Sequence, residues 1–291
     1  MKRIWINRLL SIALLCGLLT GCGATRESPS PAETPATVAT ETPARAEFSV
    51  DLLSTGKSDC AILYMDGLVI LSDTADEDDY NAIAAALKAD GVKRIDYMIL
   101  SHYDKDHIGS AASLIRNFEV GTVLRPAHEE ASGEYYALVK AESAMDTEVV
   151  LLRENYYIQT ANGLITIDPP DEDYGDDNNN SALMTVTYKG HNLLFLGDAR
   201  KKRMEEFLLA AQSEYDFIKL PHHGDGNKAL YSLLRRSAPL WAAETVSETE
   251  VVEPELLELL EKLGVTLYCT VNGPVHIEWN DGALSAVQTA R

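Results

Sequence analysis

Four potential metal ligands lie within six residues of the chain, in the run Ser101-His102-Tyr103-Asp104-Lys105-Asp106-His107-Ile108-Gly109. Two imidazoles and two carboxylates gathered this closely are costly to bury, because the carboxylates repel each other and lose their hydration. A divalent cation would offset both costs, and His and Asp are common ligands of such ions. The run therefore indicates a metal site. A calcium loop or a polar surface loop is the alternative for this run considered alone.

Three further polar groups follow apolar runs in the same way. Asp73 follows 68–72, Asp198 follows 192–196, and the pair His222-His223 follows 217–220. Each alone has a simpler explanation: Asp198 could cap the next helix, and the His pair could be a polar turn. Together they suggest one site, because active sites of layered α/β folds gather at the carboxyl ends of strands. Two cations about 3.5–4 Å apart can share a bridging carboxylate and a hydroxide, and Asp198 is placed to be that carboxylate.

The elements that must position these groups follow from hydrophobic periodicity and turn residues. The order of strands and helices is partly repeated in the two halves, which predicts two mixed sheets packed face to face with helices outside. The segment 168–180 is acidic, contains two prolines and three consecutive asparagines, and is predicted to be a loop. Strands are predicted at 48–53, 60–65, 68–72, 95–100, 120–124, 149–152, 156–159, 164–167, 182–188, 192–196, 217–220, 240–243, 265–269 and 275–279, and helices at 78–89, 111–118, 133–144, 201–212 and 255–263.

The first residues are typical of an export signal. Lys2 and Arg3 precede an apolar stretch from Leu9 to Leu19 that is too short to span a bilayer, and Gly21-Cys22 closes it. We predict a lipoprotein signal peptide at 1–21, with Cys22 lipidated and anchoring the chain to the membrane. An ordinary secretory signal or a short N-terminal anchor is the alternative. Residues 22–47 are predicted to be a flexible tether, and 48–291 the folded domain.

The formal net charge is −20. Such a charge disfavours non-specific binding to nucleic acid, because phosphate backbones are held by clustered Lys and Arg. Nucleic acid is therefore expected only as a substrate, and no protein partner is predicted. The basic run 200–203 starts a predicted helix, and we interpret it mainly as a solvated helix face balanced by Glu205 and Glu206. A rim that attracts phosphate or carboxylate is the alternative.

The set of motifs resembles the metallo-β-lactamase superfamily, and more closely the hydrolase domain of ComEC-type competence proteins. The resemblance begins near Phe48 and runs to the C-terminus. It implies an α/β (α+β) fold, a four-layer αββα sandwich with a dinuclear site at one edge. The residues that carry it are the strand and turn Val50–Cys60, Leu71-Ser72-Asp73-Thr74, the run Ser101–Gly109, Phe195-Leu196-Gly197-Asp198-Ala199 and Leu220-Pro221-His222-His223-Gly224.

The resemblance also implies roles for individual residues. His102 and Asp104 would lie in the first metal site, Asp106, His107 and His223 in the second, and Asp198 would bridge the two. The catalytic group would comprise Asp106, His222 as a residue beside the ligands or facing substrate, and Asp73 as the residue that orients the metal-binding turn. Separately from the resemblance, Asn180 and Arg200 are predicted to contact substrate. Two divalent ions are expected, Zn²⁺ first and Mn²⁺ as the alternative.

Two positions depart from the superfamily pattern. Asn178-Asn179-Asn180 stand where the superfamily often has a further His ligand, so the first site is rich in oxygen and poor in ligands. This composition favours a harder ion such as manganese. Asp225 stands where the ComEC branch tends to have Ser, which changes the expected substrate contacts.

The sequence therefore predicts an extracytoplasmic metal-dependent hydrolase on the outer face of a bacterial membrane. It would use a metal-bridging hydroxide on a phosphodiester or phosphate ester, or on another small molecule. A lactone, ester or amide hydrolase of the cell envelope is the second expectation. A non-catalytic, lipid-tethered binding protein that keeps the fold is the third.

Overall fold

The computed structural model describes residues 46–212, 214–248 and 252–290. The predicted signal peptide, Cys22 and nearly all of the predicted tether lie outside these residues. Within them, none of the helices has the length and apolar character needed to cross a membrane.

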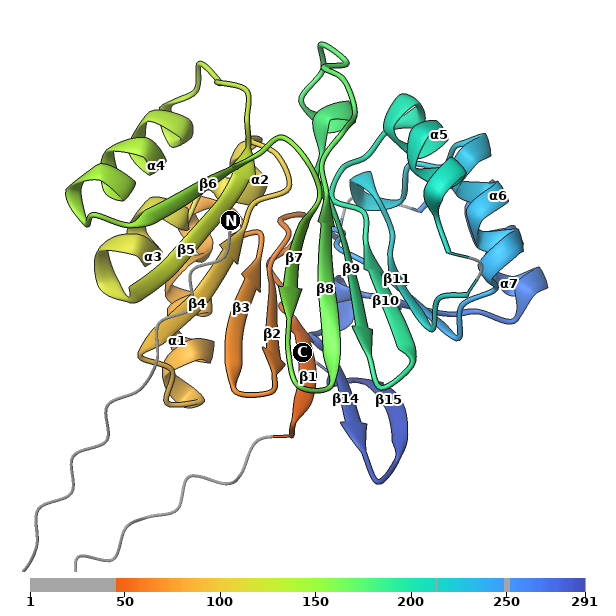
Figure 1. Cartoon of the computed structure of the whole chain (residues 1–291). Helices are drawn as coiled ribbons and strands as arrows, with labels where there is room; N and C mark the ends of the chain where they lie inside the picture. The colour runs from red at the N-terminus through yellow and green to blue at the C-terminus, as the bar shows by residue number, and fades with distance from the viewer. Residues whose placement is uncertain (1–45, 213, 249–251, 291) are drawn as a thin grey trace, which may run out of the picture. The chain divides into compact units, whose positions relative to one another are not determined.

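Two sheets form the centre of the fold (Figure 1). In the described part of the chain the first sheet has eight strands, in the order β15 (Ala283–Gln288), β14 (Val275–Asn280), β1 (Phe48–Leu52), β2 (Ala61–Met65), β3 (Leu68–Ser72), β4 (Arg94–Ile99), β5 (Glu119–Pro126) and β6 (Glu148–Leu152). The second has seven, in the order β13 (Thr266–Cys269), β12 (Trp241–Glu244), β11 (Phe217–Lys219), β10 (His191–Phe195), β9 (Leu183–Tyr188), β8 (Gly163–Asp168) and β7 (Tyr156–Gln159).

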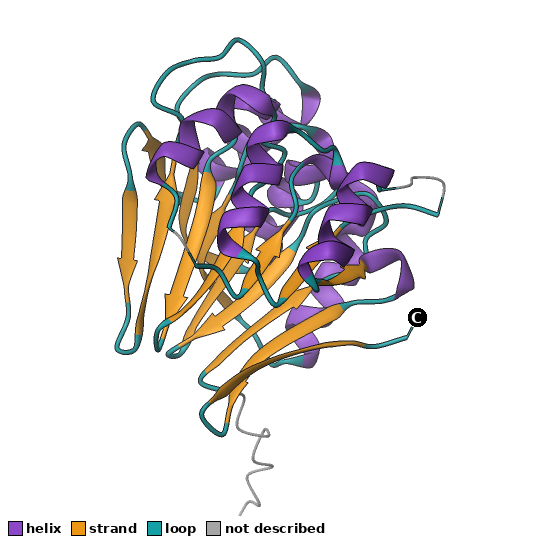
Figure 2. Ribbon diagram, turned by 90° about the vertical axis from the view of Figure 1, so that its right-hand side faces the viewer, coloured by secondary structure: helices purple, strands orange, loops and turns teal. Residues whose placement is uncertain are grey.

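Helices cover the outer face of each sheet (Figure 1), and Figure 2, turned so that one side faces the viewer, shows helices lying in front of the strands on that side. The first sheet is covered by α1 (Tyr80–Ala89), α3 (Ala111–Asn117) and α4 (Gly133–Ala144), with the short α2 (Lys105–Ile108) at its edge. The second is covered by α5 (Lys201–Ala210), α6 (Lys228–Ser237) and α7 (Pro254–Leu263).

Three hydrophobic clusters hold these layers together. The central one joins the two sheets through residues such as Phe48, Val186 and Phe217. The other two pack the helices on the outer faces, around Leu114 and Leu230 respectively. The chain is thus a four-layer αββα sandwich, and the predicted fold class is confirmed.

The direction of the strands decides where polar side chains meet. β3, β4, β5 and β6 are parallel, and so are β10, β11, β12 and β13. Parallel strands that are buried on both faces tend to be apolar along their length, and all three residues of β11 are buried. Their carboxyl ends lie at one edge of each sheet, and the loops at this edge carry the predicted site residues.

One strand was not predicted. β15 pairs with β14 across the turn Asp281-Gly282, which is a common hairpin signal. Its residues alternate between exposed and half-buried, so the strand lacks the buried apolar run on which the other predictions depended. The loop prediction for 168–180 holds apart from its ends, because β8 includes Asp168 and residues 178–180 form a 3₁₀ turn.

The basic run 200–203 does not form a single solvated face. Arg203 is fully buried, and its guanidinium donates to the backbone oxygens of Ser181 at 3.0 Å and Asp168 at 2.6 Å. It also pairs with the carboxylates of Asp168 and Glu206. Helical periodicity turns this one residue inward, where it fastens α5 to the segments on either side of the acidic loop.

We predict that Arg203→Met lowers the free energy of unfolding by about 3 kcal/mol, because it leaves two carboxylates and two carbonyls without their donor. Urea denaturation would measure the change. Lys201→Met is the matched control, since Lys201 lies two positions away on the exposed side of α5, and it should change stability by less than about 0.5 kcal/mol. Equal stabilities of the two variants would contradict the structural role of Arg203.

Candidate metal centre

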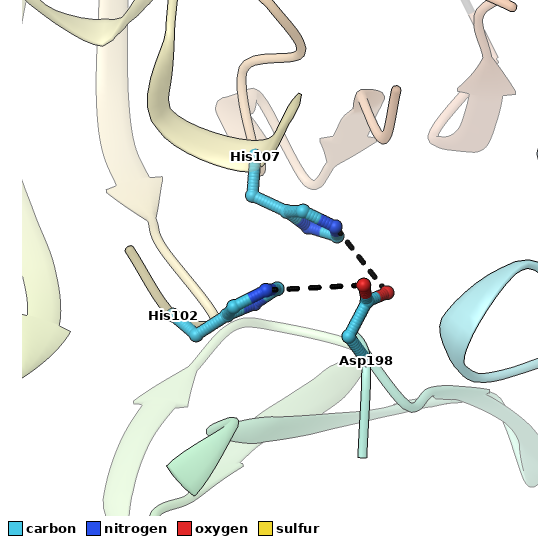
Figure 3. Close-up of side chains that lie close together, drawn as sticks. All are labelled: His102, His107 and Asp198. Atoms are coloured by element: carbon cyan, nitrogen blue, oxygen red, sulfur yellow. Dashed lines mark ion pairs between the residues drawn. The ribbon is translucent and has the colours of Figure 1, made fainter. Parts of the chain in front are cut away.

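The turn after β4 and the turn after β10 meet at the shared edge of the two sheets. His102 and His107 come from the first turn and point at the carboxylate of Asp198, which comes from the second (Figure 3). His107 Nε2 lies 3.3 Å from Asp198 Oδ1, and His102 Nε2 lies 3.9 Å from Asp198 Oδ2. All three residues are buried. The imidazoles of His102 and His107 thus both face the carboxylate that was predicted to bridge the two metals.

Three more of the predicted ligands border the same carboxylate. His223 Nε2 lies 3.5 Å from Asp198 Oδ2 and 3.7 Å from Asp106 Oδ2. Asp104 Oδ2 lies 3.5 Å from His102 Nε2, on the more exposed side. The groups with the spacing of metal ligands include one of His102, His107 and Asp198 and one of Asp106, His107 and His223. All six predicted ligands therefore lie in one cluster.

Each of the three imidazoles is held through its other ring nitrogen. Nδ1 of His102 lies 3.0 Å from Ser101 Oγ, and Nδ1 of His107 lies 2.9 Å from Asp73 Oδ2. Nδ1 of His223 lies 3.0 Å from the backbone oxygen of Thr245. An acceptor at Nδ1 fixes the tautomer that leaves Nε2 with a free lone pair, which is the usual arrangement behind metal-binding histidines.

Asp73 has the contacts of a residue that orients the turn. It accepts from the backbone nitrogen and the hydroxyl of Ser101, each at 2.8 Å, besides facing His107 Nδ1. Its own backbone has a φ of 56°, a conformation that costs energy for a non-glycine residue. The carboxylate therefore ties the end of β3 to both ends of the metal-type turn.

The turn that carries His223 is also strained. His222, His223 and Gly224 have φ values of 46°, 52° and 88° in succession. A Cβ at Gly224 would lie 2.4 Å from a carboxylate oxygen of Glu244, so a glycine is required at this position. Strained backbone persists where surrounding contacts fix it, and here it directs the His223 ring toward Asp198.

The electrostatics of the cluster favour a cation at its centre. Burial raises the pKa of the Asp198 carboxyl, but the imidazoles, first that of His107, outweigh this and hold the pKa well below its usual range. Burial lowers the pKa of His223, while Asp106 and Asp198 raise it to about 9. Burial lowers the pKa of His107 as well, yet the surrounding carboxylates, first Asp198, raise it well above its usual value.

These shifts show that the buried carboxylates create a negative potential at the imidazoles, which a bound cation would neutralise in place of protons on Nε2. Among the described residues, His107 Nε2, Asp198 Oδ1 and His223 Nε2 are buried atoms without a hydrogen-bond partner of acceptable geometry. Orphaned polar atoms of this kind are rare in folded proteins and usually face an ion or water. The donor set therefore fits divalent cations.

His222 and Arg200 lie beside this cluster rather than in it. His222 Nε2 is 3.0 Å from Arg200 Nη2, and His222 Nδ1 contacts the carboxylate of Asp225. Arg200 is half-exposed and also faces Asp176 at 3.6 Å. The two side chains form a rim at the mouth of the cluster, where the Arg200 guanidinium can meet an anionic ligand.

The three consecutive asparagines point in different directions. Asn180 accepts from Tyr174 N and donates to Asp173, so its amide holds the acidic loop. Asn179 accepts from Lys202 N and Arg203 N and so caps α5. Asn178 is the one whose amide lies against His102, Asp104 and Arg200. Asn180 stays a predicted substrate contact, and of the three asparagines it is Asn178 whose amide lies beside the candidate ligands.

Asp177, on the same loop, was also missed. It forms a third group with ligand spacing, together with His102 and Asp104. Its two oxygens are already used, one by Tyr103 N at 2.7 Å and one by His128 Nε2 at 2.7 Å. An acidic loop without a ligand pattern gave no signal that would single out this residue.

A buried ion pair behind the cluster was not predicted either. Asp59, in the loop before β2, contacts Lys219 Nζ and Thr245 Oγ1 through its two oxygens. Its backbone nitrogen donates to Asp106 O at 3.0 Å. The backbone oxygen of Thr245 in turn contacts Nδ1 of His223. Asp59 therefore connects Asp106, a ligand next to the first sheet, with the residue that holds His223, a ligand next to the second. The detectable signal was Lys219, a single charge inside an otherwise apolar strand directly before the His pair.

Charges in this pair depend on each other. Burial raises the pKa of Asp59, but Lys219 and the imidazoles outweigh it and the pKa is lowered. Burial lowers the pKa of Lys219, and Asp59 outweighs that effect and raises it. Both groups are therefore charged, and neither has access to solvent that could replace its partner.

We predict that Lys219→Met destabilises the protein by about 3–5 kcal/mol, because it leaves Asp59 as an uncompensated buried charge. The double variant Asp59→Asn, Lys219→Met should recover a large part of that loss, since no charge is then buried alone. A double-mutant cycle from urea denaturation would measure the coupling. Additive effects of the two substitutions would refute the pairing.

The chain is similar to known proteins in sequence and in fold. Residues 54–239 match the family model of the metallo-beta-lactamase superfamily. A curated relative, ComE operon protein 3 of Bacillus subtilis (strain 168), is 24% identical over 203 residues. That match covers 67% of this chain but 26% of the relative, so the chain spans about a quarter of the relative's length.

Two solved structures have a similar fold. The metallo-beta-lactamase fold protein YhfI from Bacillus subtilis has a TM-score of 0.54 at 10% identity, with 82% of this chain and 100% of that chain covered. A CmlA beta-hydroxylase mutant also has a TM-score of 0.54, at 16% identity, with 84% of this chain and 54% of that chain covered. The family match extends over more than half of the sequence and includes both turns that form the cluster. The chain belongs to the metallo-β-lactamase superfamily.

Proposed function

We propose that this protein is a two-metal hydrolase that cleaves a phosphodiester or phosphate ester outside the cytoplasm. The observation that carries the proposal is the convergence of three buried imidazoles, each held at Nδ1, on the single carboxylate of Asp198. A purely structural cluster would not need to leave three buried polar atoms without partners.

The six candidate ligands divide into two adjoining sites. His102 and Asp104 would hold one cation, and Asp106, His107 and His223 would hold the other. Asp198 would contact both cations. When bound, the cations supply an activated water near neutral pH and positive charge for the developing oxyanion. Zinc suits the imidazole-rich second site, whereas the oxygen-rich first site also suits manganese.

The other residues act around these ligands. Asp73 fixes the turn that carries His102 and His107, so that the imidazoles keep their direction during binding. His222 accepts from Arg200 and is positioned by Asp225, so its ring faces the mouth of the cluster. Once Arg200 has turned from His222 Nε2 to a bound substrate, a proton on that nitrogen would be in place to pass to an oxygen of the leaving group.

Arg200 supports a phosphate-containing substrate. Its guanidinium is half-exposed at the rim, and such a planar group can bind two phosphate oxygens at once. Because the protein carries a net charge of −20, binding of an anion needs a local cation of this kind.

A neutral carboxylic ester, lactone or amide is the second candidate substrate. The observation that favours it is a groove of about 310 Å³ beside the acidic loop. His128 and Asn180 are among the residues that line this groove. Three consecutive acids, Asp171, Glu172 and Asp173, line this groove and would repel an anionic group. A non-catalytic binding protein would show no turnover with either class.

We propose a location on the outer face of the bacterial membrane, held by a lipid on Cys22. The support is the charged start, the apolar stretch Leu9–Leu19 and the following Gly21-Cys22, all outside the described residues. Labelling with a radioactive or clickable fatty acid, compared between the native chain and Cys22→Ala, would test it.

We predict that Asp198→Ala lowers hydrolysis of bis-nitrophenyl phosphate by at least about 100-fold, because it removes the shared ligand that stabilises charge in the reaction. Metal content, measured by mass spectrometry, should fall in parallel. Asp146→Asn is the control, since Asp146 is exposed beyond α4 and Asn tolerates its φ of 53°. Full activity of Asp198→Ala, or metal-free wild-type protein after loading, would overturn the proposed function.

We predict that Arg200→Gln raises KM about tenfold for an anionic phosphodiester, through loss of a charge-assisted hydrogen bond. The KM for a neutral nitrophenyl ester should change little. Lys201→Gln, which alters an exposed neighbouring cation, should leave both values unchanged. An equal change for both substrates would argue against phosphate recognition by Arg200.

A further inference from the structure

Asn178 lies where the first site lacks a ligand. It is buried, and its backbone is fixed by hydrogen bonds from its nitrogen to Asp176 Oδ1 at 3.1 Å and from Ser181 N to its oxygen at 3.2 Å. One terminal atom of its amide lies 3.0 Å from Asp104 Oδ2 and 3.2 Å from His102 Nε2. The other terminal atom lies 3.0 Å from Arg200 Nη2.

The two amide orientations at this place have different consequences. With nitrogen toward the cluster, the amide donates to Asp104 and His102 while its oxygen accepts from Arg200. With oxygen toward the cluster, it joins two other electron-pair donors, an arrangement that is repulsive without a cation between them and favourable with one. The choice therefore depends on whether positive charge is present.

We propose that the side-chain oxygen of Asn178 is a ligand of the first metal ion, together with His102, Asp104 and Asp198. The inference rests on the proposed two-metal function and deepens it. It assigns an amide oxygen to the position where the superfamily commonly uses an imidazole. An oxygen ligand of this kind favours Mn²⁺ or another hard ion over Zn²⁺ at this site.

The neighbouring candidate is less suited to this role. Asp177 has ligand spacing to His102 and Asp104, but both of its oxygens already accept hydrogen bonds, from Tyr103 N and His128. Asn178 has an amide that can turn without losing a backbone contact, because its backbone bonds do not involve the side chain.

Ligation by Asn178 also changes Arg200. The guanidinium can donate to the amide only while the amide oxygen faces outward, so this bond and metal ligation exclude each other. With the oxygen turned inward, Arg200 has donors free for an anionic substrate. The same side chain thus links occupation of the first site to the availability of the cationic rim.

The test is metal binding by the intact folded chain, with Mn²⁺ and Zn²⁺ used separately. Stoichiometry and affinity would come from equilibrium dialysis with mass spectrometry. Electron paramagnetic resonance of the Mn²⁺ form would show whether two ions are spin-coupled. Three variants are compared: Asn178→Ala removes the oxygen, Asn178→Asp keeps one, and Asn179→Ala alters the same loop through the α5 cap instead.

Wild-type protein and Asn179→Ala are expected to bind two coupled Mn²⁺ ions. Asn178→Ala should bind the first-site ion about 10- to 100-fold more weakly and lose the coupled signal, while the second site stays filled. Asn178→Asp should restore both ions. If Asn178→Ala binds two coupled ions with wild-type affinity, or if Asn178→Asp fails to restore what Asn178→Ala loses, the inference is wrong and the proposed function stands. If the wild type itself binds no metal, the proposed function fails as well.

Discussion

The concentration of buried negative charge at the edge of the two sheets is the constraint on which the rest of the site depends. Asp198, Asp73 and Asp59 are all nearly excluded from water, and each is compensated by a different cation or donor. Asp59 has a lysine, Asp73 has an imidazole and two donors from Ser101, and Asp198 faces imidazoles within the described part of the chain. The candidate ligands converge on Asp198, where a bound cation would supply the positive charge that neutral imidazoles lack.

This constraint also explains the local backbone. Turns that direct several short side chains at one point cannot always adopt low-energy backbone conformations. Positive φ values accordingly occur at Asp73, His222 and His223. The ordered layers on either side supply the packing that maintains them. The buried Arg203 likewise holds the acidic loop in place, by hydrogen bonds to backbone oxygens at both ends of the loop. The position of this loop determines where Asn178 lies.

The sequence predicted the layers well because buried parallel strands leave a strong signal, a short apolar run followed by a polar turn. The six candidate ligands could be named for the same reason, since each follows such a run. β15 escaped because it buries little, and alternation without burial gives no hydrophobic signal. Asn178 and Asn180 could not be separated because a loop has no periodicity from which to infer direction. Asp59 and Lys219 are 160 residues apart, and only the assembled fold shows that they meet.

The division of the cluster between the two sheets has a consequence for how the protein reaches its working state. His102 and His107 come from the first half of the chain, whereas Asp198 and His223 come from the second. Neither half of the chain alone carries the complete set of ligands. Tight binding of cations therefore requires that the two sheets have already packed against each other. Metal would then bind late in folding and would slow unfolding, since binding stabilises only the native state. A partly folded chain would be selectively exposed to proteolysis, so the supply of metal would influence the lifetime of the folded protein.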